Sequence, residues 1–221
     1  MEEKEFIFNE ESKEIGFKIY NDPYGEGKPL FEFPDETLTI KPGVTCLVGC
    51  NGYGKSTIIN RISEIHAMNK DDFELVQFND REDGGQSLIE KATMYGDFRI
   101  VSEMVQSSEG ERIVIYFGTA LTELRQKILN NKKKAFVITI DSIDSGLSID
   151  NIDLIKNLIC EHIAKEAPNV YILISVISYE FTKNMRCIDT HTGCKVRFLK
   201  RYDSYAEYIR ETAEIKRKRF E

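Results

Sequence analysis

The chain has 221 residues and a formal net charge of −7, with 41% hydrophobic and 30% charged residues. These fractions are ordinary for a globular protein, and the length allows one well-buried core, so we expect a single domain over residues 1–221. The acidic balance argues against a protein that coats duplex nucleic acid with a broad basic face.

The cysteines and the amino-terminal residues indicate the compartment. The five cysteines are an odd set, and positions 46, 50, 160, 187 and 194 lack the spacing of a metal site. The first residues contain no apolar signal core, and the apolar stretches are far shorter than the roughly 20 residues that span a bilayer. We therefore expect a reducing, cytoplasmic location and no membrane partner.

Residues 6–40 contain short segments in which apolar and polar side chains alternate. They lie at 6–8, 15–20, 30–33 and 38–40, and glycine, proline and asparagine between them provide turn chemistry. The pattern predicts an antiparallel β region at the amino-terminal end.

The next segment is an apolar run, 44–48, followed by residues 49–57, which fit the phosphate-binding pattern G-x-x-x-x-G-K-[ST]. In such a loop, backbone N–H groups and the start of the following helix surround phosphate oxygens, a lysine reaches the β- and γ-phosphates, and a serine ligates Mg²⁺. The predicted ATP contacts are Gly49, Asn51, Gly52, Tyr53, Gly54, Lys55, Ser56 and Thr57, with Ser56 also a metal ligand. The alternative is a glycine turn that binds nothing, but such a turn does not require the Lys-Ser pair.

The remaining chain alternates helices and strands. Helical spacing predicts helices at 56–68, 112–129, 148–165 and from 203 onward, and apolar runs predict strands at 73–78, 135–140, 170–176, 186–189 and 195–199. Residues 79–96 are polar and marked by glycine, and 97–106 are moderately helical, so we expect a small inserted helical lobe at about 79–110. Strands alternating with helices predict an α/β core.

Asp141 ends the apolar strand 135–140, and a carboxylate in this position can hold Mg²⁺ opposite a phosphate loop. The alternative is an aspartate that caps a strand end. We expect the basic residues 216–219 to form a solvated tail, and the alternative is that they contact nucleic acid.

Three motifs together resemble the ATP-binding-cassette (ABC) ATPases. Residues 49–57 match the family's G-x-N-G-x-G-K-S-T, residues 107–111 (Ser-Ser-Glu-Gly-Glu) resemble its L-S-G-G-Q signature, and residues 141–148 resemble its D-E-P-T-S-G-L-D segment. The likeness is to the soluble branch that includes structural-maintenance-of-chromosomes (SMC) and RecF-like proteins. The further elements 83–85 and 96–98 resemble small stand-alone ATP-binding proteins of bacterial and phage genomes.

The resemblance implies a P-loop NTPase fold with an ABC-ATPase-like core and a head-to-tail homodimer that closes on two ATP molecules. Ser108 and Gly110, at a helix start, would then grip the nucleotide bound to the partner. The alternative for Ser108 is an ordinary helix cap.

Two departures from the family pattern concern catalysis. Ser142 stands where the family has its glutamate base, and Ile177 stands where it has a histidine. A missing base typically costs ~10² to 10⁴ in rate, so we expect slow hydrolysis or none. Asp144 is a candidate for positioning water, or it is a turn residue; Gln77, with Asn79 close behind, is the candidate for reporting the nucleotide, or it faces solvent.

These features leave three functions open. The first is a slow Mg²⁺-dependent ATPase whose pairing acts on DNA or on a DNA-processing partner, and the second is an ATP-dependent dimer switch that does not hydrolyse. The third, disfavoured because the segment between loop and signature is short, is the ATP-binding subunit of a transporter.

Overall fold

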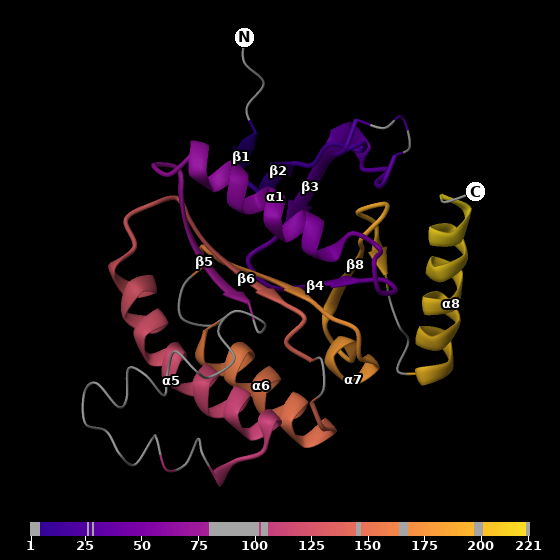
Figure 1. The fold of residues 1–221 in the computed structure, drawn as a ribbon. Coiled ribbons are helices and arrows are strands. Elements are labelled where there is room, and N and C mark those ends of the chain that lie inside the picture. The colour runs from indigo at the N-terminus through magenta and orange to yellow at the C-terminus, as the bar shows by residue number, and fades with distance from the viewer. Residues whose placement is uncertain are drawn as a thin grey trace.

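The computed structural model describes residues 5–25, 27, 29–79, 102, 106–144, 147–163, 168–196 and 201–219. It contains two sheets (Figure 1). The first is antiparallel, in the order β1 (Phe6–Phe8), β2 (Ile15–Lys18), β3 (Thr37–Ile40). The predicted antiparallel region is therefore confirmed.

The second sheet has six strands in the order β5-β6-β7-β4-β8-β9. Their bounds are β4 Gly43–Val48, β5 Phe73–Asn79, β6 Ala135–Asp141, β7 Val170–Ser175, β8 Arg186–Asp189 and β9 Lys195–Val196. The strands are parallel except for β9, which runs antiparallel to β8. All the parallel strands thus end at the same edge of the sheet, the edge from which the loop after β4 emerges.

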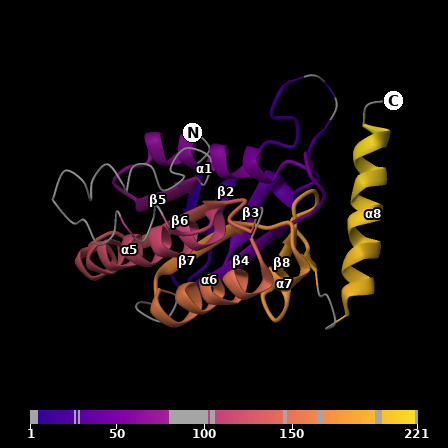
Figure 2. The same ribbon diagram turned by 60° about the horizontal axis from the view of Figure 1, so that its bottom comes forward.

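Helices cover both faces of this sheet (Figure 1). Helix α1 (Lys55–Met68) lies on one face, together with the antiparallel sheet, and α5 (Glu109–Asn130) and α6 (Ile149–His162) lie on the other. The short helices are η1 (Pro34–Glu36) and α7 (Tyr179–Thr182). Helix α8 (Tyr202–Lys218) stands at the β8 side of the molecule in both ribbon views (Figures 1 and 2).

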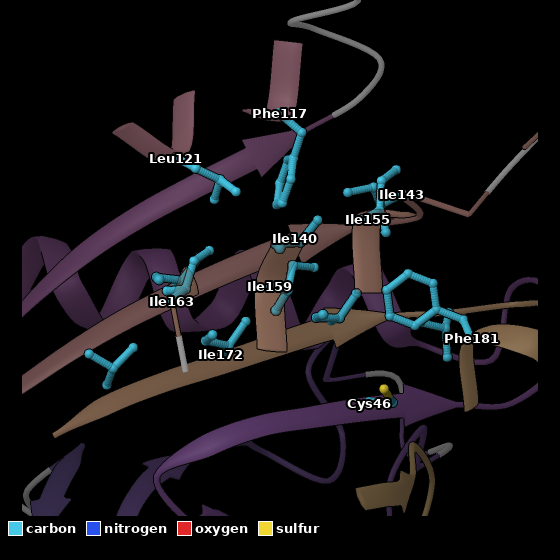
Figure 3. Packing of buried hydrophobic residues seen from close by; sticks show 14 of the residues in the cluster. Cys46, Phe117, Leu121, Ile140, Ile143, Ile155, Ile159, Ile163, Ile172 and Phe181 are labelled. Atoms are coloured by element: carbon cyan, nitrogen blue, oxygen red, sulfur yellow. The ribbon is translucent and has the colours of Figure 1, made fainter. Parts of the chain in front are cut away.

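Alternate residues of the buried strands enter two separate cores. On β6, Ala135 and Val137 pack on the α1 side, whereas Phe136, Ile138 and Ile140 pack against α5 and α6. Figure 3 shows the second core, where Phe117 and Leu121 of α5 and Ile155 and Ile159 of α6 lie over Ile140 and Ile172. A parallel sheet buried on both faces explains the nearly continuous apolar runs in these strands.

The predicted α/β class is confirmed, and one predicted strand is wrong. Residues 30–33 form no strand; instead the backbone N–H groups of Leu30 and Phe31 donate to the Asn21 carbonyl and that of Phe33 to Asn21 Oδ1. Alternation correctly indicated that Phe31 and Phe33 are buried. The proposed helical lobe at about 79–110, with the elements 83–85 and 96–98, lies almost wholly outside the described residues.

Candidate nucleotide site

The loop between β4 and α1 has the backbone that its glycines allow. Gly49 and Gly54 have φ values of 149° and 106°. A Cβ on Gly49 would lie 2.3 Å from Tyr53 Cδ1, and one on Gly54 would lie 2.7 Å from Phe31 Cε1, so only glycine fits at either position. Gly54 is the N-cap of α1, and the loop therefore delivers the chain directly into a helix start.

Tyr53 is a structural part of this loop. Its side chain is 1% exposed, its N–H donates to the Cys50 carbonyl at 3.2 Å, and its ring lies 5.8 Å from that of His191. The predicted nucleotide contact of Tyr53 is thus not available to its ring. Asn51, Gly52 and Ser56 are exposed, and Thr57 is half-buried.

Lys55 folds back into the loop. Its Nζ donates to the carbonyl oxygens of Gly49 at 2.8 Å and Cys50 at 3.0 Å, and the residue is only 6% exposed. Burial lowers the pKa of this ammonium, although the charges of Cys50, Asp144 and Asp141 favour its protonated form. A buried cation whose hydrogen bonds go to neutral carbonyl oxygens is suited to receive an anion.

Polar side chains gather at the carboxyl ends of β6 and β7, on the α1 side of the sheet. Asp141 continues the alternate positions of β6 that face α1, and Ser175 does the same on β7. The Ser175 hydroxyl donates to Asp141 Oδ1 and accepts from the Ser142 N–H at 2.8 Å. The Ser142 hydroxyl also donates to Asp141 Oδ1, at 3.3 Å, so Asp141 is held by both serines.

Ser142 begins a tight turn after β6. Its φ is 55°, the left-handed region that a non-glycine residue adopts at a cost of about 1 kcal/mol or more. The turn leads to Asp144, which is 4% exposed. Asp144 Oδ2 accepts from the N–H groups of Ile177 at 2.9 Å and Ser178 at 2.6 Å.

The contacts of Asp144 bear on both roles left open by the sequence. Burial raises the pKa of its carboxyl, against the lowering effect of the hydrogen bonds from Ser178 and Ile177. Oδ1 is buried and has no hydrogen-bond partner among the described residues. The visible contacts are those of a turn residue that fixes the loop after β7, and water positioning by Asp144 stays a prediction.

The register of β5 ranks the two candidates for a nucleotide-reporting amide. Asn79 pairs with Asp141, whereas Gln77 pairs with Thr139, two residues earlier. Two residues along a strand correspond to about 6.6 Å. Asn79, the second candidate, therefore lies at the level of Asp141, and Gln77 does not. Gln77 is in addition exposed on an edge strand.

The predicted signature segment forms the start of α5. Ser108 is the N-cap, its Oγ accepts from the Glu111 N–H, and Glu111 Oε2 accepts from the Ser108 N–H at 2.7 Å, which completes a capping box. Ser108 is exposed, and Gly110 packs so closely on α6 that a Cβ there would lie 2.7 Å from Asn151 Nδ2. The segment therefore caps its own helix and still presents Ser108 at the surface.

The donor set suits a hard cation. Ser56 offers an exposed hydroxyl and Asp141 a half-buried carboxylate, the oxygen ligands that Mg²⁺ prefers together with phosphate and water. Among the described residues there is no group of three or more His, Cys, Asp or Glu side chains that could hold a metal by itself. The protein ligands thus fit an Mg²⁺ that arrives with a nucleotide.

Helix α8 contributes contacts that the sequence reasoning missed. The Cys50 N–H donates to Thr212 Oγ1 at 3.1 Å, Lys216 Nζ donates to the Asn51 carbonyl at 3.0 Å, and the Arg219 guanidinium lies 5.0 Å from the Tyr53 ring centre. The basic end is therefore not simply a solvated tail. Only the proximity of two segments about 165 positions apart reveals this, which no local pattern encodes.

Comparisons with known proteins give limited support. No family model and no curated protein matches the chain. Among solved structures, cbiO1 from Clostridium perfringens, part of the ABC transporter complex cbiONQ, aligns with a TM-score of 0.46 and 14% identity over 80% of this chain and 84% of that chain. Drosophila ORC bound to GC-rich DNA and Cdc6 aligns with a TM-score of 0.29 and 10% identity over 77% of this chain and 52% of that one.

These likenesses are too distant to carry a functional argument. The strand order gives an α/β fold with a separate antiparallel sheet, and residues 49–57 form a glycine loop between β4 and α1. No described helix has both the length and the apolar surface needed to cross a lipid bilayer.

Proposed function

We propose that this protein binds ATP with Mg²⁺ in the loop 49–57, that ATP binding pairs two copies head to tail, and that hydrolysis is slow. The observation that supports the proposal best is Lys55, an ammonium held inside a glycine loop by the carbonyls of Gly49 and Cys50. A triphosphate gives this cation a negatively charged partner and gives the loop's N–H groups and the start of α1 their acceptors.

The side chains divide the work of binding. Lys55 would exchange the two carbonyls for the β- and γ-phosphates, and Ser56 and Asp141 would hold the metal ion. Mg²⁺, when bound, neutralises phosphate charge. Ser175 and Ser142 keep the Asp141 carboxylate in one orientation, so the metal ligand is fixed before the nucleotide arrives.

Slow hydrolysis follows from the residues after β6. Ser142 occupies the position of the expected base, and a serine hydroxyl accepts no proton at neutral pH. Asp144, two residues after Ser142, is a carboxylate that could orient water, but its Oδ2 already accepts two backbone N–H groups. A switch that binds ATP and does not hydrolyse it is therefore the second candidate, and Ser142 favours it.

Head-to-tail pairing is supported by the exposure of Ser108 at the start of α5. The loop 49–57 lies between β4 and α1, whereas α5 covers the opposite face of the sheet (Figure 1). A helix start placed in this way serves a nucleotide on another copy. A link to DNA or to a DNA-processing partner rests on the motif resemblance alone, and retention on DNA only when ATP is present would test it.

Equilibrium binding and sizing test the proposal together. ATP·Mg²⁺ is titrated into wild type, Lys55→Ala and the control Lys70→Ala, since Lys70 is an exposed lysine near the end of α1. We expect Lys55→Ala to weaken binding by about 100-fold, the range for losing a charged partner, and Lys70→Ala to have no effect. ATP binding that survives in Lys55→Ala would exclude this site, and a monomer at saturating ATP would exclude the pairing.

A further inference from the structure

One face of helix α8 contacts the phosphate loop. Thr212, Lys216 and Arg219 are spaced i, i+4 and i+7, which places them on one side of a helix. They contact Cys50, Asn51 and Tyr53 respectively, three positions of the loop. The helix and the loop therefore contact each other through three residue pairs, and not through a single side chain.

The preceding turns of α8 fix the helix to the same edge of the sheet. Tyr208 OH donates to Asp189 Oδ2 at 2.5 Å and lies 3.0 Å from the Val48 carbonyl oxygen, and Tyr205 OH donates to the Ile177 carbonyl at 2.6 Å. Val48 and Asp189 are the last residues of β4 and β8, and Ile177 follows β7. The position of Lys216 is thus set by hydrogen bonds that do not involve Lys216.

Lys216 brings a second ammonium to the loop. Its Nζ donates to the Asn51 carbonyl, and a Cβ on Gly52 would lie 2.7 Å from this nitrogen, so glycine at position 52 makes the approach possible. Lys216 is half-buried, whereas Arg217 and Lys218 are exposed. As with Lys55, its hydrogen bond goes to a neutral carbonyl.

Two ammonium groups beside one short loop repel each other. Lys55 Nζ donates to the carbonyls of Gly49 and Cys50, and Lys216 Nζ donates to the carbonyl of the next residue, Asn51. Such convergence is unfavourable until an anion lies between or beside the two charges. A triphosphate supplies several negative charges at this place.

We propose that Lys216 is a second phosphate-binding lysine, delivered to the nucleoside triphosphate from the carboxyl-terminal helix. The inference rests on the proposed function, since it assigns a further residue to the same site. Lysine binds phosphate as a point charge on a flexible stem, so Nζ can leave the Asn51 carbonyl for a phosphate oxygen without movement of α8. The bound nucleotide then connects α8 to the loop through Lys216.

The test is equilibrium binding of ATP·Mg²⁺ and ADP·Mg²⁺ to wild type, Lys216→Gln, Lys216→Arg and the matched control Lys218→Gln. Lys216→Gln keeps a donor for the Asn51 carbonyl and removes the charge. We expect it to weaken ATP binding about 10-fold and ADP binding less, with Lys216→Arg within about 3-fold of wild type and Lys218→Gln within about 2-fold. Thermal unfolding without nucleotide checks that each variant folds.

Three outcomes separate the possibilities. If Lys216→Gln binds ATP as Lys218→Gln does, Lys216 only tethers the helix and the inference is overturned. If Lys216→Gln weakens ATP and ADP equally and Lys216→Arg does not restore affinity, loop distortion explains the loss and the inference is again overturned. If wild type and Lys55→Ala bind alike, the proposed function fails first, and that result is independent of Lys216.

Discussion

Ser175 and Asp141 are joined across the carboxyl ends of neighbouring strands, because the Ser175 hydroxyl on β7 donates to Asp141 Oδ1 on β6. Ser175 is fully buried, and its oxygen also accepts from the Ser142 N–H at 2.8 Å. One buried hydroxyl therefore links the proposed metal ligand to the turn that begins at Ser142.

Ser175→Ala should lower both stability and metal-dependent binding. The substitution leaves the Ser142 N–H without its acceptor and removes one of the two hydroxyl donors to Asp141 Oδ1. A lost buried hydrogen bond costs about 1–3 kcal/mol. We also expect a higher Mg²⁺ concentration for half-maximal ATP binding, measured by titration at fixed ATP. Thr139→Val is the control, because the Thr139 hydroxyl is buried without a partner among the described residues. Unfolding free energies that are equal in the two variants would contradict the role given to Ser175.

The buried strands and the phosphate loop could be predicted because each has a local signature. The run 135–140 is apolar at every position but Thr139 because both faces of β6 are covered, and the spacing of Gly49, Gly54 and Lys55 is set by the backbone of one short turn. The strand predicted at 30–33 is wrong because alternation reports which side chains are buried, not whether a neighbouring strand is present. Phe31 and Phe33 are indeed buried, but Asn21 takes the place of a strand partner.

Long-range register could not be predicted. The order β6-β7-β4 brings Ser175 beside Asp141, and the β5 register places Asn79 rather than Gln77 at the level of Asp141. The helix 202–218 was visible in its periodicity, but its contact with the loop depends on how the chain end returns to β4. Polar contacts of this kind, such as Thr212 with Cys50, have no pattern in the sequence near either residue.

Ser142→Glu should accelerate ATP hydrolysis by about 10²-fold or more, the usual contribution of a general base. The left-handed φ of 55° at Ser142 penalises glutamate and serine alike, so the substitution adds little backbone strain. The measurement is steady-state phosphate release with saturating ATP·Mg²⁺. Ser142→Gln is the control, because glutamine has the size of glutamate but cannot act as a base, and this variant should hydrolyse ATP as slowly as wild type. Equal rates for the glutamate and glutamine variants would show that position 142 does not face the attacking water.

Asp144→Asn should raise stability at neutral pH. The folded state holds the Asp144 carboxyl at a raised pKa because of burial, so it binds a proton more readily than the unfolded chain. The charged form therefore costs free energy above the folded pKa, and this cost disappears as the pH falls through that pKa toward the ordinary pKa of an aspartate carboxyl. The asparagine oxygen can accept the N–H groups of Ile177 and Ser178 in place of Oδ2.

We expect the free energy of unfolding of Asp144→Asn to exceed that of wild type at pH 7, and the difference to be smaller at pH 4.5. Chemical unfolding of both proteins at the two pH values measures it. A loss of stability at pH 7 would show that the carboxylate charge stabilises the turn. Phosphate release by the same variant reports separately on water positioning, which requires a fall of at least about 10-fold.

Ser108→Arg should prevent ATP-dependent pairing and leave nucleotide affinity unchanged. Ser108 is exposed at the start of α5. Arginine is much longer than serine, so its side chain would obstruct the triphosphate site of a partner sterically. Ser108→Ala separates this effect from the loss of the helix cap, which costs about 1 kcal/mol in either variant. Sedimentation with and without ATP·Mg²⁺ should show wild-type dimers, weaker pairing for alanine and only monomers for arginine. Dimers of Ser108→Arg at the wild-type affinity would mean that the start of α5 is not part of the pairing face.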